Sequence, residues 1–201
     1  LSHAALIEPL AVACHDVRRS RLQKGEDVLV IGGGPIGLLV ATVAKAAGAN
    51  ITISELNPTR IDTAQKLGFK TLNPNQNDVA AVLHMATGNK GADVIFEVSG
   101  TQSGVDTMTA AASTRCRIVM VAIHAEAPQV DMFQFFWREI ELLGARVYEP
   151  KDYDQAINLI AAGAVDCDTM ITDVRDLAQI EEAFQSLGEN PEAVKSLIKC
   201  S

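Results

Sequence analysis

Three glycines at fixed spacing constrain the fold of this 201-residue chain more than any other feature. Gly32, Gly34 and Gly37 form a G-x-G-x-x-G pattern between a β-branched run and an apolar, helix-like stretch, in VLVIGGGPIGLLVA. In that context the first glycine permits a tight turn and the second lets the backbone approach a pyrophosphate, while the third lets the helix pack close to the strand. The pattern predicts a strand–loop–helix unit with a dinucleotide at the helix N-terminus.

The rest of the sequence alternates between strand-like and helix-like segments. Short β-branched runs predict strands at residues 28–31, 51–54, 93–99 and 117–123. Stretches with helical spacing predict helices at residues 38–47, 59–67, 79–86 and 105–112. Apolar strands that alternate with helices are typical of a parallel sheet covered on both faces. We therefore expect an α/β fold with a doubly wound parallel sheet, the Rossmann fold, in three α/β/α layers.

A carboxylate at the end of the second predicted strand strengthens the dinucleotide prediction. Glu55 follows the loop by about 20 residues, where such a side chain accepts hydrogen bonds from the ribose hydroxyls. Its charge would repel a 2′-phosphate, so NAD is favoured over NADP, although Arg60 nearby could offset this repulsion. A P-loop is excluded because Leu38 and Leu39 stand where Lys and Ser/Thr are needed.

Other classes of protein fit the sequence less well. A methyltransferase that binds S-adenosylmethionine shares the glycine-rich turn and the acidic strand end, but the third glycine favours a dinucleotide. The net charge of -8 argues against nucleic acid, and no apolar run approaches the length of a bilayer span. The four cysteines form no C-x-x-C pair, so we expect buried free thiols in a reducing compartment, the cytoplasm, rather than structural zinc.

Several further segments match one known family in the same order along the chain. They are AALIEPLAVACHDVRRS, GEDVLVIGGGPIGLL, ISELNPTR, GADVIFEVSG, RIVMVAI, REIELLGARVY and DLAQIEEAFQSL…AVKSLIKC. With these segments the sequence resembles the zinc-dependent medium-chain alcohol and polyol dehydrogenases, most closely the sorbitol and 2,3-butanediol dehydrogenase branch. The resemblance implies hydride transfer between a secondary alcohol or polyol and NAD, with zinc polarising the alcohol oxygen.

The resemblance also implies which positions of this sequence contact the cofactor. It places the pyrophosphate at residues 34–37, the adenosine ribose at Glu55 and the adenine near Arg60. It also places residues 98–100 at a turn beside the cofactor and residues 121–123 near the nicotinamide. Ala122 stands where family members often have glycine, and the usual glycine pair before that strand is replaced by Thr114 and Arg115. The full set of expected cofactor-binding residues is Gly32, Gly34, Pro35, Ile36, Gly37, Glu55, Leu56, Arg60, Val98, Ser99, Gly100, Val121, Ala122 and Ile123.

Glu8, in an otherwise apolar run, is explained by the same resemblance. In polyol-dehydrogenase-like members a carboxylate of this E-P-L segment lies at the catalytic zinc, as a ligand or holding its water. The other ligands, a cysteine and a His-Glu pair, come from an N-terminal domain that we expect this chain to lack. Because catalytic zinc usually needs three protein ligands, we expect zinc in the intact enzyme only and no catalytic residue in this chain. An exposed helix carboxylate is the alternative interpretation of Glu8.

The expected organisation has three parts. Residues 1–20 are a linker helix from the missing catalytic domain, residues 21–148 the NAD-binding domain, and residues 149–201 a segment that returns to the catalytic domain. We expect a homodimer or homotetramer, formed near Arg146 and Val147, that acts on a small alcohol or polyol and binds neither nucleic acid nor membrane. A stand-alone dinucleotide-binding sensor or interaction module is the second hypothesis.

Two remaining features receive weaker predictions. The aromatic cluster at residues 132–137, MFQFFW, is expected to serve core or subunit packing rather than substrate stacking. His124 follows the strand predicted to end near the nicotinamide, but no paired histidine or acidic spacing assigns it a role.

Overall fold

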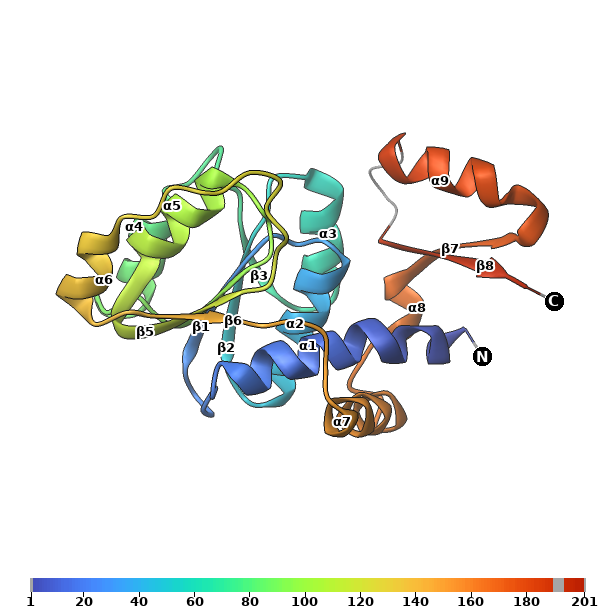
Figure 1. The fold of residues 1–201 in the computed structure, drawn as a ribbon, viewed down its shortest axis with the longest axis horizontal. Coiled ribbons are helices and arrows are strands. Elements are labelled where there is room, and N and C mark those ends of the chain that lie inside the picture. Colours follow the sequence, from blue (N-terminus) through green and yellow to red (C-terminus); the bar gives the residue numbers. More distant parts are fainter. Residues whose placement is uncertain (1, 190–193, 201) are drawn as a thin grey trace.

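A six-stranded sheet, parallel throughout, forms the centre of the computed structural model, which describes residues 2–189 and 194–200 (Figure 1). Its strands are β1 (Asp27–Ile31), β2 (Asn50–Ser54), β3 (Lys70–Leu72), β4 (Ala92–Glu97), β5 (Ala112–Met120) and β6 (Glu141–Gly144). The spatial order is β3-β2-β1-β4-β5-β6, so the winding direction reverses between β1 and β4. This is the order of the doubly wound dinucleotide-binding fold, and the predicted fold class is confirmed.

Helices cover both faces of this sheet. They are α1 (Ile7–Arg19), α2 (Pro35–Ala46), α3 (Pro58–Lys66), α4 (Val79–Ala86), α5 (Gln102–Ala111), α6 (Met132–Arg138) and α7 (Pro150–Ala161). In Figure 1, α4, α5 and α6 lie to the left of the strands, and α2 and α3 lie to the right. Alternate strand residues point to opposite faces, so Val28 and Val30 join the core beneath α1 and α2, whereas Leu29 and Ile31 join the core beneath α4 and α5.

Side-chain caps fix where most of the sheet-covering helices begin. Asn57, Asp78, Thr101 and Asp131 each accept a hydrogen bond from a backbone N–H in the first turn of α3, α4, α5 and α6, respectively. Such caps satisfy N–H groups that have no partner within the helix. Helix α2 differs, because its N-cap is Gly34 and no side chain caps it. Its first-turn N–H groups therefore remain available to a ligand.

The structure contains elements that the sequence pattern did not predict. Strands β3 and β6 are only three and four residues long, too short for a clear alternation. The strands predicted at residues 93–99 and 117–123 end earlier, at Glu97 and Met120. The aromatic cluster predicted to serve core or subunit packing contributes only Phe135 to the core, because Met132, Phe133, Phe136 and Trp137 are between 61% and 77% exposed. Subunit packing by these exposed side chains stays a prediction.

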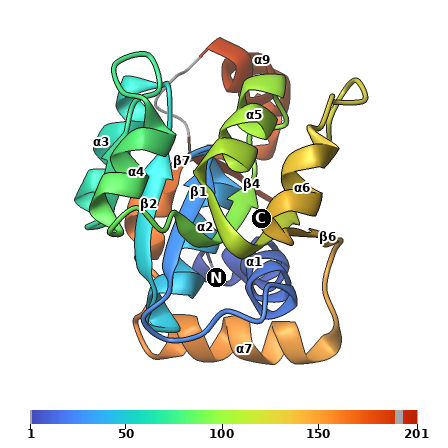
Figure 2. The same ribbon diagram turned by 90° about the vertical axis from the view of Figure 1, so that its left-hand side faces the viewer.

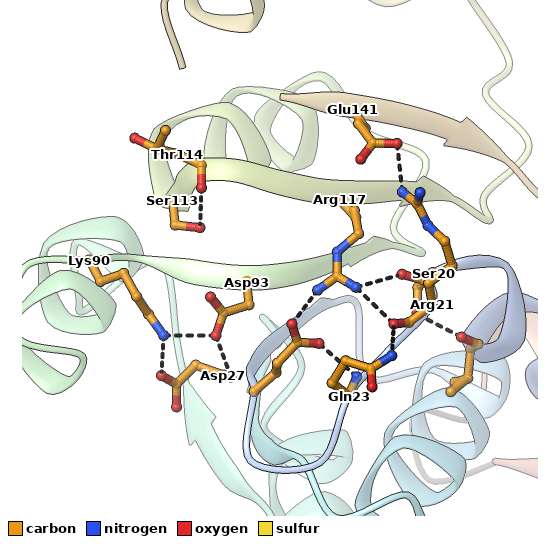
Figure 3. A network of polar contacts seen from close by, with 12 residues as sticks. Ser20, Arg21, Gln23, Asp27, Lys90, Asp93, Ser113, Thr114, Arg117 and Glu141 are labelled. Atoms are coloured by element: carbon orange, nitrogen blue, oxygen red, sulfur yellow. Dashed lines mark hydrogen bonds and ion pairs between the residues drawn. The ribbon is translucent and has the colours of Figure 1, made fainter. Parts of the chain in front are cut away.

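Arg117 of β5 anchors the loop that connects α1 to β1 (Figure 3). Its guanidinium donates hydrogen bonds to the carbonyl oxygens of Ser20, at 3.0 Å, and Arg21, at 2.9 Å. It also pairs with Glu26 Oε1 at 2.5 Å, and Arg21 pairs with Glu141 of β6 at 2.6 Å. Charge-assisted bonds of this kind are among the stronger ones in proteins. The network therefore fixes the start of β1, whose other end leads into the glycine loop.

The C-terminal part of the chain first packs against α1 and then forms a second, smaller sheet that is separate from the main one. Helix α7 packs against α1 and crosses it: α1 is seen from the side and α7 nearly end-on in Figure 1, whereas α7 is seen from the side in Figure 2. After the short α8 (Cys167–Met170), β7 (Ile171–Asp176) and β8 (Lys195–Lys199) form a separate parallel pair, with α9 (Ile180–Glu189) beside it (Figure 1). Among the helices described here, none is long and apolar enough to cross a membrane.

Buried charges tie α1 to α7. Arg18 Nε lies 2.8 Å from Asp152 Oδ1, and His15 Nδ1 lies 3.0 Å from Asp152 Oδ2. Burial alone would raise the pKa of Asp152, but hydrogen bonds from Arg18, the Glu149 backbone N–H and His15 lower it well below its usual value. Asp16 beside it is buried, and neither of its oxygens has a partner. Burial, together with the charge of Asp152, raises the pKa of Asp16 to about 7.

Candidate dinucleotide-binding site

A cavity of about 270 Å³ opens at the carboxyl ends of β1, β2 and β4, where the winding direction reverses. Ligands of doubly wound folds bind at this switch point. The cavity brings together predicted cofactor residues from three separate loops, namely Gly32, Gly34, Glu55, Leu56, Arg60, Val98 and Ser99. The segment of residues 121–123 does not line this cavity, although it lies next to one of its walls.

The geometry explains separately why positions 32, 34 and 37 of the loop are glycine. Gly32 has a φ of +106°, a conformation that favours glycine, and a Cβ there would lie 3.1 Å from Ser99 N. A Cβ on Gly37 would overlap the carbonyl oxygen of Gly32, so α2 can pack this closely only on glycine. Gly34 has ordinary dihedral angles, and a Cβ there would meet no atom closer than 3.8 Å. Gly34 thus leaves open space next to Pro35 and Ile36 in the first turn of α2.

Glu55 is held against the glycine loop by backbone groups. Its Oε2 accepts a hydrogen bond from Gly33 N–H at 2.7 Å, and its Oε1 accepts bonds from Leu56 N–H at 2.7 Å and Asn57 N–H at 2.8 Å. The side chain is only 7% exposed, and Arg60 lies 4.0 Å away. A carboxylate fixed at the edge of the cavity can accept hydrogen bonds from a vicinal diol and disfavours a second anion.

The turn predicted beside the cofactor, at residues 98–100, and the segment predicted near the nicotinamide, at residues 121–123, lie next to each other. Gly100 has a φ of +67°, and a Cβ there would lie 3.2 Å from the carbonyl oxygen of Ile123 and 3.5 Å from Ala122 Cβ. Ile123 itself is 97% exposed, so its side chain is free for contact with a further domain or ligand. A side chain at position 100 would therefore meet Ala122, which stands where family members often have glycine.

Sequence reasoning missed Glu97, which lies behind both of these segments. It is the last residue of β4 and is completely buried. The signal was present in IFEVSG, since a charged residue at the end of an apolar strand must find partners when it is buried. Its partners are mostly backbone groups, which sequence patterns do not reveal.

The described residues do not form a zinc site. Glu8 is exposed in the first turn of α1. Within residues 2–189 and 194–200, no cluster of three or more His, Cys, Asp or Glu side chains is arranged to hold a metal ion. Cys14, Cys116 and Cys167 are buried and Cys200 is exposed, so the prediction of buried thiols fails for Cys200. Burial raises the pKa of Cys14 and of Cys116 to about 12, which keeps these thiols protonated.

Comparison with known proteins assigns the chain to a family. The profile of the zinc-binding dehydrogenases matches residues 35–162. The chain therefore belongs to the zinc-binding dehydrogenase family, as its motifs predicted.

Individual relatives agree with this assignment. The 2-dehydro-3-deoxy-L-galactonate 5-dehydrogenase of Pseudoalteromonas atlantica is 54% identical over 201 residues, which are all of this chain and 59% of that protein. The crystal structure of 2R,3R-butanediol dehydrogenase from Bacillus subtilis has a TM-score of 0.93 and 33% identity, over 98% of this chain and 57% of that chain. A zinc-binding dehydrogenase of Sinorhizobium meliloti, solved bound to NADP, has a TM-score of 0.86 and 28% identity, over 98% and 58% of the two chains. The chain thus spans less than two thirds of each of these relatives.

Proposed function

We propose that this chain is the NAD(H)-binding portion of a zinc-dependent dehydrogenase that acts on a secondary alcohol or polyol. The observation that carries the proposal is the shared cavity of the glycine loop and the Glu55 carboxylate at the switch point of the sheet. A bound nicotinamide dinucleotide would supply the hydride acceptor. The chain would position that cofactor and contribute no catalytic residue of its own.

Each part of the cavity suits a different part of the dinucleotide. The open space at Gly34 and the uncapped first turn of α2 suit the pyrophosphate. Glu55 suits the adenosine ribose, with Leu56 and Arg60 beside the adenine. The turn at residues 98–100 and the segment at 121–123 would face the nicotinamide.

The charge at Glu55 supports NAD over NADP, because a 2′-phosphate would lie next to a buried carboxylate. Arg60 acts in the other direction, since its guanidinium could pair with that phosphate. The Sinorhizobium relative was solved with NADP, so a relative of this chain binds the phosphorylated cofactor. The affinities of this chain for NADH and NADPH are therefore to be measured side by side.

We expect Glu55→Ala to weaken NADH binding by about ten-fold and to leave NADPH binding unchanged or stronger. The substitution removes the acceptor for the ribose hydroxyls and the charge that opposes the 2′-phosphate. Fluorescence titration with NADH and NADPH measures both affinities, and Glu126→Ala, at an exposed site, is the control. An unchanged ratio of the two affinities would contradict the role of Glu55.

The flanking parts fit a longer protein. We propose that residues 1–20 and 149–201 pack with a catalytic domain that carries the zinc ligands, and that the exposed Glu8 carboxylate lies near that zinc. The relatives named above act on different substrates according to their names, a galactonate derivative and a butanediol. We therefore propose the class of substrate, a small secondary alcohol or polyol, and no single compound.

We further propose that the protein forms a homodimer or homotetramer through the β6 edge of the sheet. Among the described strands β6 is an outer one, paired only with β5. Leu142 on this strand is 45% exposed and Val147, just after it, is 40% exposed. Exposed strand edges are usually covered or paired in native proteins, and a second copy would cover this one.

A further inference from the structure

Glu97 is a buried carboxylate beneath the candidate site. In register, it lies between Ile31 of β1, the last residue before the glycine loop, and Met120 of β5. Its relative exposure is 0%, and it is not among the residues that line the cavity. A carboxylate buried to this extent is strongly destabilising unless its oxygens accept hydrogen bonds.

Glu97 binds both segments that the proposed function places near the nicotinamide. Its Oε1 accepts hydrogen bonds from Ser99 N–H at 2.9 Å, from the Ser99 hydroxyl, and from Gly100 N–H at 3.2 Å. Its backbone carbonyl oxygen accepts bonds from Val121 N–H and Ala122 N–H, both at 3.0 Å. One residue therefore holds the turn at 98–100 with its side chain and the segment at 121–122 with its main chain.

Two neighbours complete the environment of this carboxylate. His124 Nε2 lies 3.4 Å from Glu97 Oε2, and the histidine side chain is only 12% exposed. Gly104 lies in the first turn of α5, where a Cβ would overlap Ser99 Oγ and approach Glu97 Oε1 to 2.7 Å. A side chain at position 104 would therefore displace the carboxylate or the Ser99 hydroxyl. The first turn of α5 also favours a negative charge, because the helix dipole is positive there.

We infer that Glu97 is a positioning residue, which fixes the Ser99–Gly100 turn and the segment from Val121 to His124 in the geometry that receives the cofactor. It acts through these residues, since it is buried beneath them and does not reach the cavity. The inference rests on the proposed function for the identity of the ligand. The hydrogen bonds that carry it are independent of that ligand.

Glu97→Gln tests this role with little change in side-chain size. The amide keeps one acceptor oxygen but turns the other into a donor, which would face Gly100 N–H where Oε2 now accepts a bond at 3.3 Å. The substitution also removes the negative charge that strengthens the remaining bonds to Ser99 and Gly100. In the 201-residue chain without cofactor, we expect the amide hydrogens of Ser99 and Gly100 to exchange at least about ten-fold faster, while those in the middle of β1 do not change. We also expect NADH to bind about ten-fold more weakly. Glu126→Gln, on the surface, is the matched control.

A second variant distinguishes loss of the Glu97 contact from a general loss of stability. Gly104→Ala displaces the same carboxylate from the opposite side, so it should accelerate exchange at the same two amides. Both substitutions disturb the contact between the Glu97 carboxylate and the Ser99–Gly100 turn. The double variant should therefore accelerate exchange by less than the two single effects combined. Unchanged exchange at Ser99 and Gly100 in Glu97→Gln would overturn the inference. If the wild-type chain fails to bind NADH, the proposed function fails, and the exchange rates still decide the role of Glu97.

Discussion

Replacing Gly37 by alanine is expected to destabilise the fold by about 3 kcal/mol and to lower NADH affinity by at least about 100-fold. The added methyl group would overlap the carbonyl oxygen of Gly32, a backbone atom that no side-chain rotation can move aside. Helix α2 would have to shift away from β1, and the loop between them would lose its shape. Urea unfolding measures the first effect, and fluorescence titration with NADH measures the second.

Gly144→Ala is the matched control for Gly37→Ala. Gly144 ends β6, and a Cβ there would meet no atom within 4 Å, so the change should alter stability by less than about 0.5 kcal/mol. If Gly37→Ala were as stable as the wild-type chain, the close contact between α2 and the glycine loop would not exist as described.

Replacing Asp16 by asparagine is expected to stabilise the chain at alkaline pH and to have much less effect at acidic pH. The Asp16 carboxyl has a pKa raised from 3.8 to about 7, first by burial and then by the charge of Asp152. The folded chain therefore holds a proton that the unfolded chain releases between pH 4 and pH 7, so stability falls as pH rises through this window. The full loss of stability, from below pH 4 to above pH 7, is roughly 4 kcal/mol, of which roughly 3 kcal/mol falls between pH 5 and pH 8.5.

The groups around Asp16 do not cancel this dependence. Asp152 keeps its negative charge throughout the window because its own pKa is lowered, and the Cys14 thiol stays protonated because its pKa is raised to about 12. His15 and Arg18 are bonded to Asp152, and neither of them bonds Asp16. Urea unfolding at pH 5 and pH 8.5 measures the effect, with the exposed Asp154→Asn as control. A variant whose stability relative to wild type is the same at both pH values would contradict the raised pKa.

The parts of the molecule that sequence could predict depend on local patterns. The glycine loop and Glu55 were found because a strand, a turn and a helix follow one another within a short stretch, each with its own periodicity. Strands β3 and β6 escaped because three or four residues carry no clear period. The aromatic residues of α6 predicted core or subunit packing, but the sequence did not reveal that only one side of the helix faces the sheet and that Phe135 alone joins the core.

Features that depend on distant contacts lay beyond sequence reasoning. Arg18 and Asp152 are 134 positions apart, and nothing local links them. Arg115 has a φ of +62°, a conformation in which the glycine expected there by resemblance would be unstrained. Its side chain instead pairs with Glu139 at 2.6 Å. Glu97 escaped because its partners are mainly N–H groups, which every residue except proline carries.

Titration of the wild-type chain and of Gly34→Ala with NADH tests the central claim most directly. Alanine fits at position 34 in the absence of ligand, because no atom lies closer than 3.8 Å to its Cβ, but it would occupy the space proposed for the pyrophosphate. We predict saturable binding of NADH to the wild-type chain and a loss of at least about ten-fold in Gly34→Ala, with unfolding stability unchanged. Equal NADH binding by the two proteins, or no binding by a folded wild-type chain, would contradict a dinucleotide site at this loop.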